Sequence, residues 1–90
     1  MITHANIETE RLLDSTGETI GVLCRIEDAF RMKRYLIGYK PTADLEVWYC
    51  KERTPQSSIN VIGHKMDDIL ERYGVKDLLR NAWKEYRNDG

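Results

Sequence analysis

Apolar and polar residues alternate through the N-terminal part of the chain, a pattern typical of half-buried β-strands. The alternation is clearest between Thr19 and Ile26, where every second residue is apolar: Ile20, Val22, Cys24 and Ile26. This run is predicted to form a hairpin with residues 9–13, because residues 14–18, Asp-Ser-Thr-Gly-Glu, have the composition of a turn. Gly17 supplies the positive φ that such a turn often needs. Residues 1–7 are patterned weakly and are interpreted as a frayed segment or a short edge strand.

A second hairpin is predicted over residues 34–52. Its two strands, Tyr35–Tyr39 and Leu45–Cys50, are rich in aromatic and branched side chains. Residues 41–44, Pro-Thr-Ala-Asp, separate them and have the composition of a turn. A four-residue loop at this place would pair Ile37 with Trp48, and a change of one residue in loop length would regroup the two faces.

Both faces of this hairpin are expected to be apolar. One face would carry Leu36, Leu45, Val47 and Tyr49, and the other would carry Tyr35, Ile37, Tyr39, Trp48 and Cys50 beside Glu46. An antiparallel sheet with a solvated face normally alternates apolar and polar residues, so something should cover each side. Either helices cover one face and the other simply carries large residues, or the Tyr/Trp face is an interface for a second protein. In the second case we expect the contacts at Tyr35, Ile37, Tyr39 and Trp48.

The segments around the second hairpin allow alternatives. Glu27 and Asp28 are interpreted as a tight turn, after which residues 29–33 extend the following strand. A short helical turn over residues 27–32 is the alternative. Residues 53–58 contain Pro55 and two serines and predict a loop. Apolar residues then follow helical spacing as far as Tyr73, but Gly63 weakens this helix. The helix is therefore expected to start after Ser58, or near His64 with residues 59–62 forming a short strand.

A final helix is predicted from about residue 75 to 88, after Gly74, a favourable residue for ending the preceding helix. Its apolar stripe consists of Val75, Leu78, Leu79, Ala82, Trp83 and Tyr86. The predicted fold is therefore a single α+β domain over residues 1–90. An antiparallel meander of three to four strands is followed by two C-terminal helices packed on one face of the sheet.

Composition favours a soluble, cytoplasmic domain. Of the 90 residues, 41% are hydrophobic and 32% are charged, and the net charge is −1, so no bulk attraction to a polyanion or membrane is expected. The N-terminus does not resemble a signal peptide. Cys24 and Cys50 both fall among apolar neighbours in predicted strands, where we expect free thiols.

The sequence makes no positive case for an enzyme, a cofactor or a metal site. The cysteines and histidines lack the close spacing of metal half-sites, and the glycines are scattered and do not form a phosphate-binding loop. His64 with Asp68, four residues apart, and Cys50 with His64 are the nearest approaches to a metal half-site and a nucleophilic pair. The pair of His64 and Asp68 is more typical of polar surface residues, and Cys50 is more typical of a buried thiol.

The expected function is that of a small non-catalytic interaction domain, of the inhibitor, adaptor or assembly-factor type. It would bind another protein or itself as a homodimer through the Tyr/Trp face. The alternative is a module for single-stranded nucleic acid or RNA, which combines cations with stacking rings. That set would be Arg31, Lys33, Arg34, Tyr35, Tyr39 and Lys40. The sequence does not identify the partner, and a small-molecule pocket would leave no specific trace in it.

Overall fold

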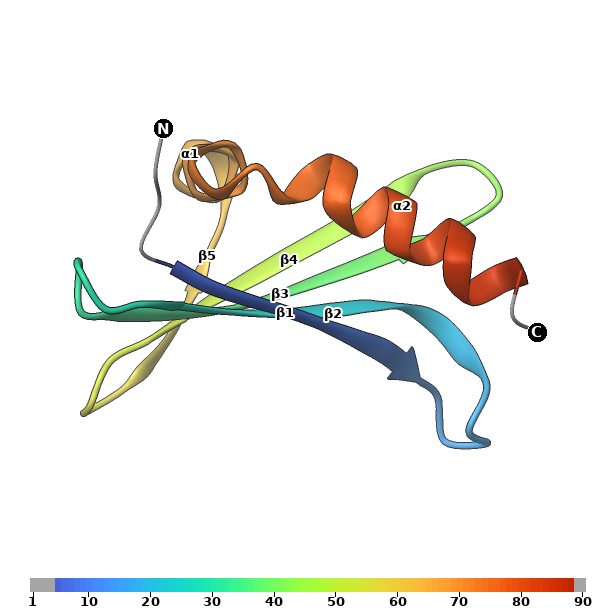
Figure 1. Cartoon of the computed structure of the whole chain (residues 1–90), viewed down its shortest axis with the longest axis horizontal. Coiled ribbons are helices and arrows are strands. Elements are labelled where there is room, and N and C mark those ends of the chain that lie inside the picture. The colour runs from blue at the N-terminus through green and yellow to red at the C-terminus, as the bar shows by residue number, and fades with distance from the viewer. Residues whose placement is uncertain (1–4, 89–90) are drawn as a thin grey trace.

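The five strands of the computed structural model form one antiparallel sheet in the order of the chain, and two helices follow them (Figure 1). The structure describes residues 5–88. The predicted α+β meander with two C-terminal helices is confirmed. The elements are β1 (Ala5–Leu13), β2 (Thr19–Asp28), β3 (Lys33–Pro41), β4 (Glu46–Arg53), β5 (Ser58–Val61), α1 (Gly63–Tyr73) and α2 (Val75–Asn88).

The β1–β2 hairpin has the turn that its sequence predicts. The Asp14 carboxylate accepts hydrogen bonds from the backbone N–H groups of Thr16 and Glu18, at 2.8 and 3.0 Å, and Gly17 has φ 86°. Residues 1–4, the first part of the predicted lead-in, lie outside the described residues, and β1 begins at Ala5.

The β3–β4 hairpin differs from the prediction in its register. The loop consists of Thr42–Leu45, one residue later than expected, and the Thr42 N–H and hydroxyl both donate to the Leu45 carbonyl. Tyr39 therefore pairs with Trp48, and Ile37 pairs with Cys50. The predicted pairing of Ile37 with Trp48 is wrong by two residues. The predicted faces are correct except for Leu45, which lies in the loop, because an even displacement keeps each side chain on its side of the sheet.

The alternatives left open by the sequence are also resolved. Residues 58–61 form a fifth strand, and α1 starts at Gly63, where φ is 65°. Residues 29–32 form the turn, closed by a hydrogen bond from the Met32 N–H to the Ala29 carbonyl. The predicted turn at Glu27 and Asp28 is therefore wrong, because both residues belong to β2. Gly74 ends α1 in the left-handed conformation, as expected.

Both helices lie on the same side of the sheet, and α2 crosses it (Figure 1). The core between the layers is formed by alternate residues of the strands and by one stripe of each helix. Its most deeply buried side chains are Val22, Cys24, Ile26, Ile37, Leu70, Val75 and Leu79. None of the described elements covers the other face of the sheet.

Candidate interaction surface

The aromatic face predicted to bind a partner is the face that the helices cover. Tyr35, Ile37 and Tyr39 have only 3, 0 and 4% of their surface exposed, and Trp48 is half-buried against the same core. The expectation that these side chains form an open interface is wrong, because α1 and α2 supply their cover. Sequence pattern could not distinguish the covered face from the open one, since both carry large apolar residues.

One end of this covered face is closed by a polar cluster of Glu46, Tyr39 and Arg80. The Arg80 guanidinium donates to both carboxylate oxygens of Glu46, at 2.7 and 2.8 Å, and the Tyr39 hydroxyl donates to one of them at 2.7 Å. These contacts, with Arg80 the main cause, lower the pKa of Glu46 to about 2. Burial, and then the bond to Glu46, raises the pKa of Tyr39 to about 12. The centroids of the Trp48 and Tyr39 rings lie 4.4 Å apart. Through Arg80, Tyr39 and Glu46 the cluster therefore joins α2 to β3 and β4.

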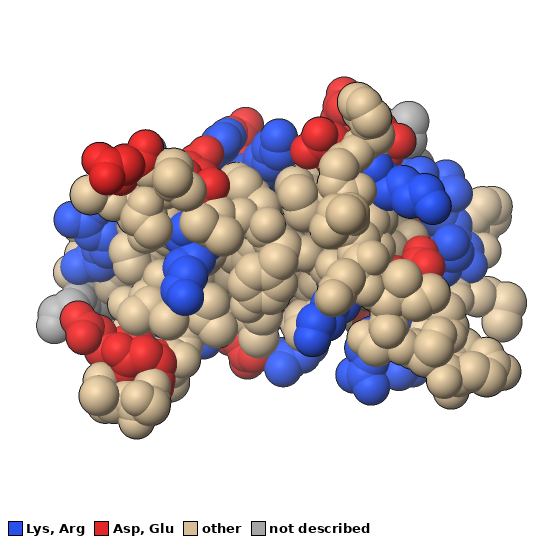
Figure 2. Space-filling model, turned by 180° about the vertical axis from the view of Figure 1, so that it is seen from behind, with Lys and Arg blue, Asp and Glu red and all other residues tan. Residues whose placement is uncertain are grey.

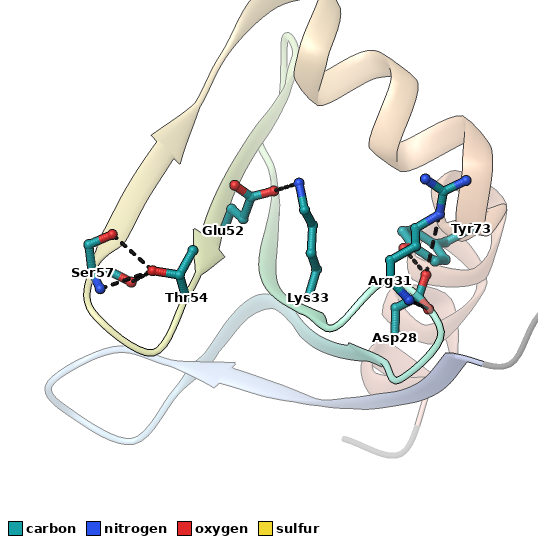
Figure 3. Close-up of polar contacts among 7 residues, drawn as sticks. All are labelled: Asp28, Arg31, Lys33, Glu52, Thr54, Ser57 and Tyr73. Carbon is teal, nitrogen blue, oxygen red and sulfur yellow. Dashed lines mark hydrogen bonds and ion pairs between the residues drawn. The ribbon is translucent and has the colours of Figure 1, made fainter.

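At the other end of the covered face, two of the cations predicted to bind nucleic acid form ion pairs with carboxylates. Lys33 donates to Glu52 at 3.1 Å, and the Arg31 guanidinium lies 3.7 Å from Asp28 (Figure 3). Asp28 also accepts a hydrogen bond from the Tyr73 hydroxyl, and this bond is the main cause of the lowered pKa of Asp28. Since the two tyrosines of the predicted set are buried, the set does not form one exposed surface.

The open face of the sheet is made by the residues that alternate with the core. The strand registers place its side chains in cross-strand rows, of which two hold most of the apolar surface. One row runs from Leu12 through Gly21 and Lys40 to Val47, and the next runs from Glu10 through Leu23 and Gly38 to Tyr49. Leu36 extends this centre, and Val47 and Tyr49 keep 38 and 37% of their surface exposed. We call this set the open-face centre: Leu12, Leu23, Leu36, Val47 and Tyr49.

The Tyr49 ring fills the space above Gly38, and any larger residue at position 38 would displace the ring. A Cβ built on Gly38 would lie 1.9 Å from Cζ of Tyr49, so the ring lies across the glycine backbone. Such covering of a strand glycine by a cross-strand aromatic ring compensates for the missing side chain. The Tyr49 ring thus lies against the sheet and contributes to the open-face centre.

Charged residues surround this centre with an uneven distribution of sign. Acidic side chains lie on β1 and β2, at Glu8, Glu10 and Glu27, whereas β3 and β4 carry Arg34, Lys40, Lys51 and Arg53. Arg25 on β2 is paired with Glu10 at 2.7 Å. Arg34 and Arg53 are directly opposed across β3 and β4, an arrangement that costs stability unless an acidic group lies nearby.

Seen from behind relative to Figure 1, the molecule has uncharged residues across its middle and side chains of both charges around them (Figure 2). Within residues 5–88, no helix is long and apolar enough to cross a membrane. Over the same residues, no three His, Cys, Asp or Glu side chains are grouped so that they could hold a metal ion.

Both cysteines are free and buried on the helix-covered face, as predicted. Burial raises the pKa of both thiols to about 11, which keeps them protonated and unreactive in the folded state. His64 lies on the first turn of α1, beside an open groove of about 670 Å³ between β5 and α1, and Cys50 is buried in the core. Cys50 is therefore a residue of the hydrophobic core.

Comparisons with protein-family models, curated proteins and solved structures find no significant match to this chain. A function is therefore inferred from the fold and the open-face centre alone.

Proposed function

We propose that this chain is a non-catalytic interaction domain that binds a protein surface through the open face of its sheet. The observation that supports this proposal is the open-face centre, a continuous apolar area that no described element covers. Such patches on single domains mark interaction sites. Charged residues surround it as they surround the apolar core of protein interfaces. The two free thiols suit a reducing compartment, and we place the domain in the cytoplasm.

A photoreactive phenylalanine analogue at Tyr49, expressed in the cell of origin, tests this proposal. The ring position points away from the helices, so a bound protein would be captured at high yield. The matched control carries the same analogue at Glu85, an exposed position on α2. We expect protein adducts at position 49 and none of the same mass at position 85. No adduct at position 49, or identical adducts at both positions, would refute the proposal.

Binding of single-stranded nucleic acid is the second candidate, supported by a revised set of residues. Arg34, Lys40, Lys51 and Arg53 share the open face with Tyr49, an exposed ring on which a base could stack. The acidic residues of β1 and β2 on the same face oppose a polyanion. Affinity for a mixed oligonucleotide that falls steeply with salt, and falls again in Tyr49→Ala, would support this candidate. Salt-independent or absent binding would exclude it.

A further inference from the structure

The charges around the open-face centre are arranged so that the face complements itself. One half of the face, on β1 and β2, presents Glu8, Glu10 and Glu27, and only Arg25 there is basic and already paired with Glu10. The other half, on β3 and β4, presents only basic charged groups: Arg34, Lys40, Lys51 and Arg53. A partner that fits this face must therefore be basic opposite β1 and acidic opposite β4.

A second copy of this chain has that distribution when it is related by a two-fold axis parallel to the strands, between β2 and β3. Rotation about this axis exchanges β1 with β4 and β2 with β3 but keeps each cross-strand row at its own level. Glu8 and Lys51 belong to one row, at its opposite ends, and Glu27 and Arg34 belong to another. Glu8 of each copy therefore faces Lys51 of the second copy, and Glu27 faces Arg34.

Part of the open-face centre also matches under the same rotation, with Tyr49 then facing Glu10 and Leu36 facing Arg25 of the second copy. Leu12 meets Val47 of the second copy because both lie in one row, at its two ends. Leu23 meets Gly38, and thus the Tyr49 ring that covers Gly38. The acidic side chain of Glu27 in the second copy also reaches the opposed pair of Arg34 and Arg53, where each copy alone places two like charges side by side. Sheets packed face to face in this way keep their strands nearly aligned.

A two-fold axis perpendicular to the strands does not match the charges. It would place β1 on β1 and β4 on β4, so that acidic residues face an acidic strand and basic residues a basic one. Four strands at their usual spacing give an open face of about 500 Å² per copy, near the lower end of the range for specific interfaces. We infer that the occupant of the open face is a second copy of this chain, held in an isologous two-fold dimer by alternating Glu–Lys and Glu–Arg pairs. This inference rests on the proposed function and names its partner.

A charge exchange between Glu8 and Lys51 tests this geometry with purified chain. In E8K homodimers both Glu8–Lys51 pairs would become repulsive, and the same holds for K51E. A mixture of the two variants can form a heterodimer in which every pair is attractive. By sedimentation analysis over a wide concentration range, we expect the wild type to dimerise and each single variant to dimerise at least tenfold more weakly. The mixture, and the double variant E8K/K51E, should regain affinity close to that of the wild type.

Lys76→Glu is the matched control, since Lys76 is exposed on α2, away from the sheet. It changes net charge as K51E does and should leave dimerisation unchanged, with circular dichroism confirming the fold of every variant. A wild type that stays monomeric, a mixture that associates no better than its components, or an equal effect of K76E would overturn the inference. If the analogue at Tyr49 captures only other proteins, the inferred dimer is refuted and the proposed function stands. If it captures no protein, both are refuted.

Discussion

The two glycines of the open face provide a sharp test of how this sheet is packed. Gly38→Ala and Gly21→Ala add the same methyl group to neighbouring strands, but the new atom meets different obstacles. At Gly38 it would lie 1.9–2.3 Å from atoms of the Tyr49 ring, a side chain that can turn outward. At Gly21 it would lie 2.2 Å from the backbone carbonyl oxygen of Tyr39, which cannot move without separating β2 from β3. The two substitutions should therefore differ in cost.

The magnitudes follow from these contacts. Alanine in a strand gains about 0.5–1 kcal/mol over glycine through backbone entropy. Displacing the Tyr49 ring uncovers ~40 Å² of apolar surface, worth about 1 kcal/mol. Gly38→Ala should thus change the free energy of unfolding by less than about 1 kcal/mol, because the two terms nearly cancel. Gly21→Ala should cost about 2 kcal/mol or more, since overpacking against backbone forces the strands apart.

Urea denaturation followed by far-UV circular dichroism measures both variants. The decisive comparison uses a Tyr49→Ala background, in which the obstacle to a Cβ at Gly38 is absent. There Gly38→Ala should stabilise the protein by about 0.5–1 kcal/mol, and Gly21→Ala should remain as damaging as before. Equal costs for the two glycine variants, unrelieved by removing the Tyr49 ring, would refute the packing described for this face.

Two further predictions concern the covered face. Because the pKa of Glu46 is lowered to about 2, its contribution to stability is complete above its ordinary value near 4.5 and is lost as the pH falls toward 2. The urea midpoint should therefore fall less between pH 5 and pH 3 in Glu46→Gln than in the wild type. Glu85→Gln, the control on α2, should behave like the wild type. A fall in the midpoint of Glu46→Gln as large as that of the wild type would contradict this prediction. Cys24 and Cys50, whose thiols are buried and have pKa values raised to about 11, should react with a disulfide reagent at pH 8 only as fast as the protein unfolds. A thiol that reacts within the mixing time in the native protein would show that the core opens locally.

The sequence was sufficient to predict the element types and the two faces of the sheet, because period-two and helical patterns are local properties. It placed the boundaries of α2 correctly for the same reason, although Leu78 of the predicted stripe is 42% exposed while Val75, Leu79 and Ala82 are buried. The pairing of β3 with β4 was wrong by two residues because Pro41 remains in the strand, and loop boundaries are set by a few hydrogen bonds around Thr42.

The candidate site was missed for a different reason. The face with Tyr35, Tyr39 and Trp48 has more aromatic residues than the face with Tyr49, and this aromatic content indicated it as the interface. Which face receives the helices depends on how the stripe of α2 docks, through contacts such as Arg80 with Glu46 that join residues 34 positions apart in the chain. Such contacts leave no local pattern. Leu36, Val47 and Tyr49, which share one side of the hairpin, indicate that the second face is apolar but not that the helices leave it open.

The position of α2 at the end of the described chain has a consequence for the order of folding. Every strand pairs with its neighbour in sequence, so the sheet can be assembled from hairpins as they are synthesised. Its cover cannot: Arg11 on β1 reaches the Tyr86 carbonyl at 3.3 Å across 75 residues, and the core side chains Val75 and Leu79 belong to the same late helix. Until α2 emerges, a nascent chain exposes apolar residues on both sides of its sheet. The interval before α2 docks is therefore when this protein is most prone to aggregate and most in need of a chaperone.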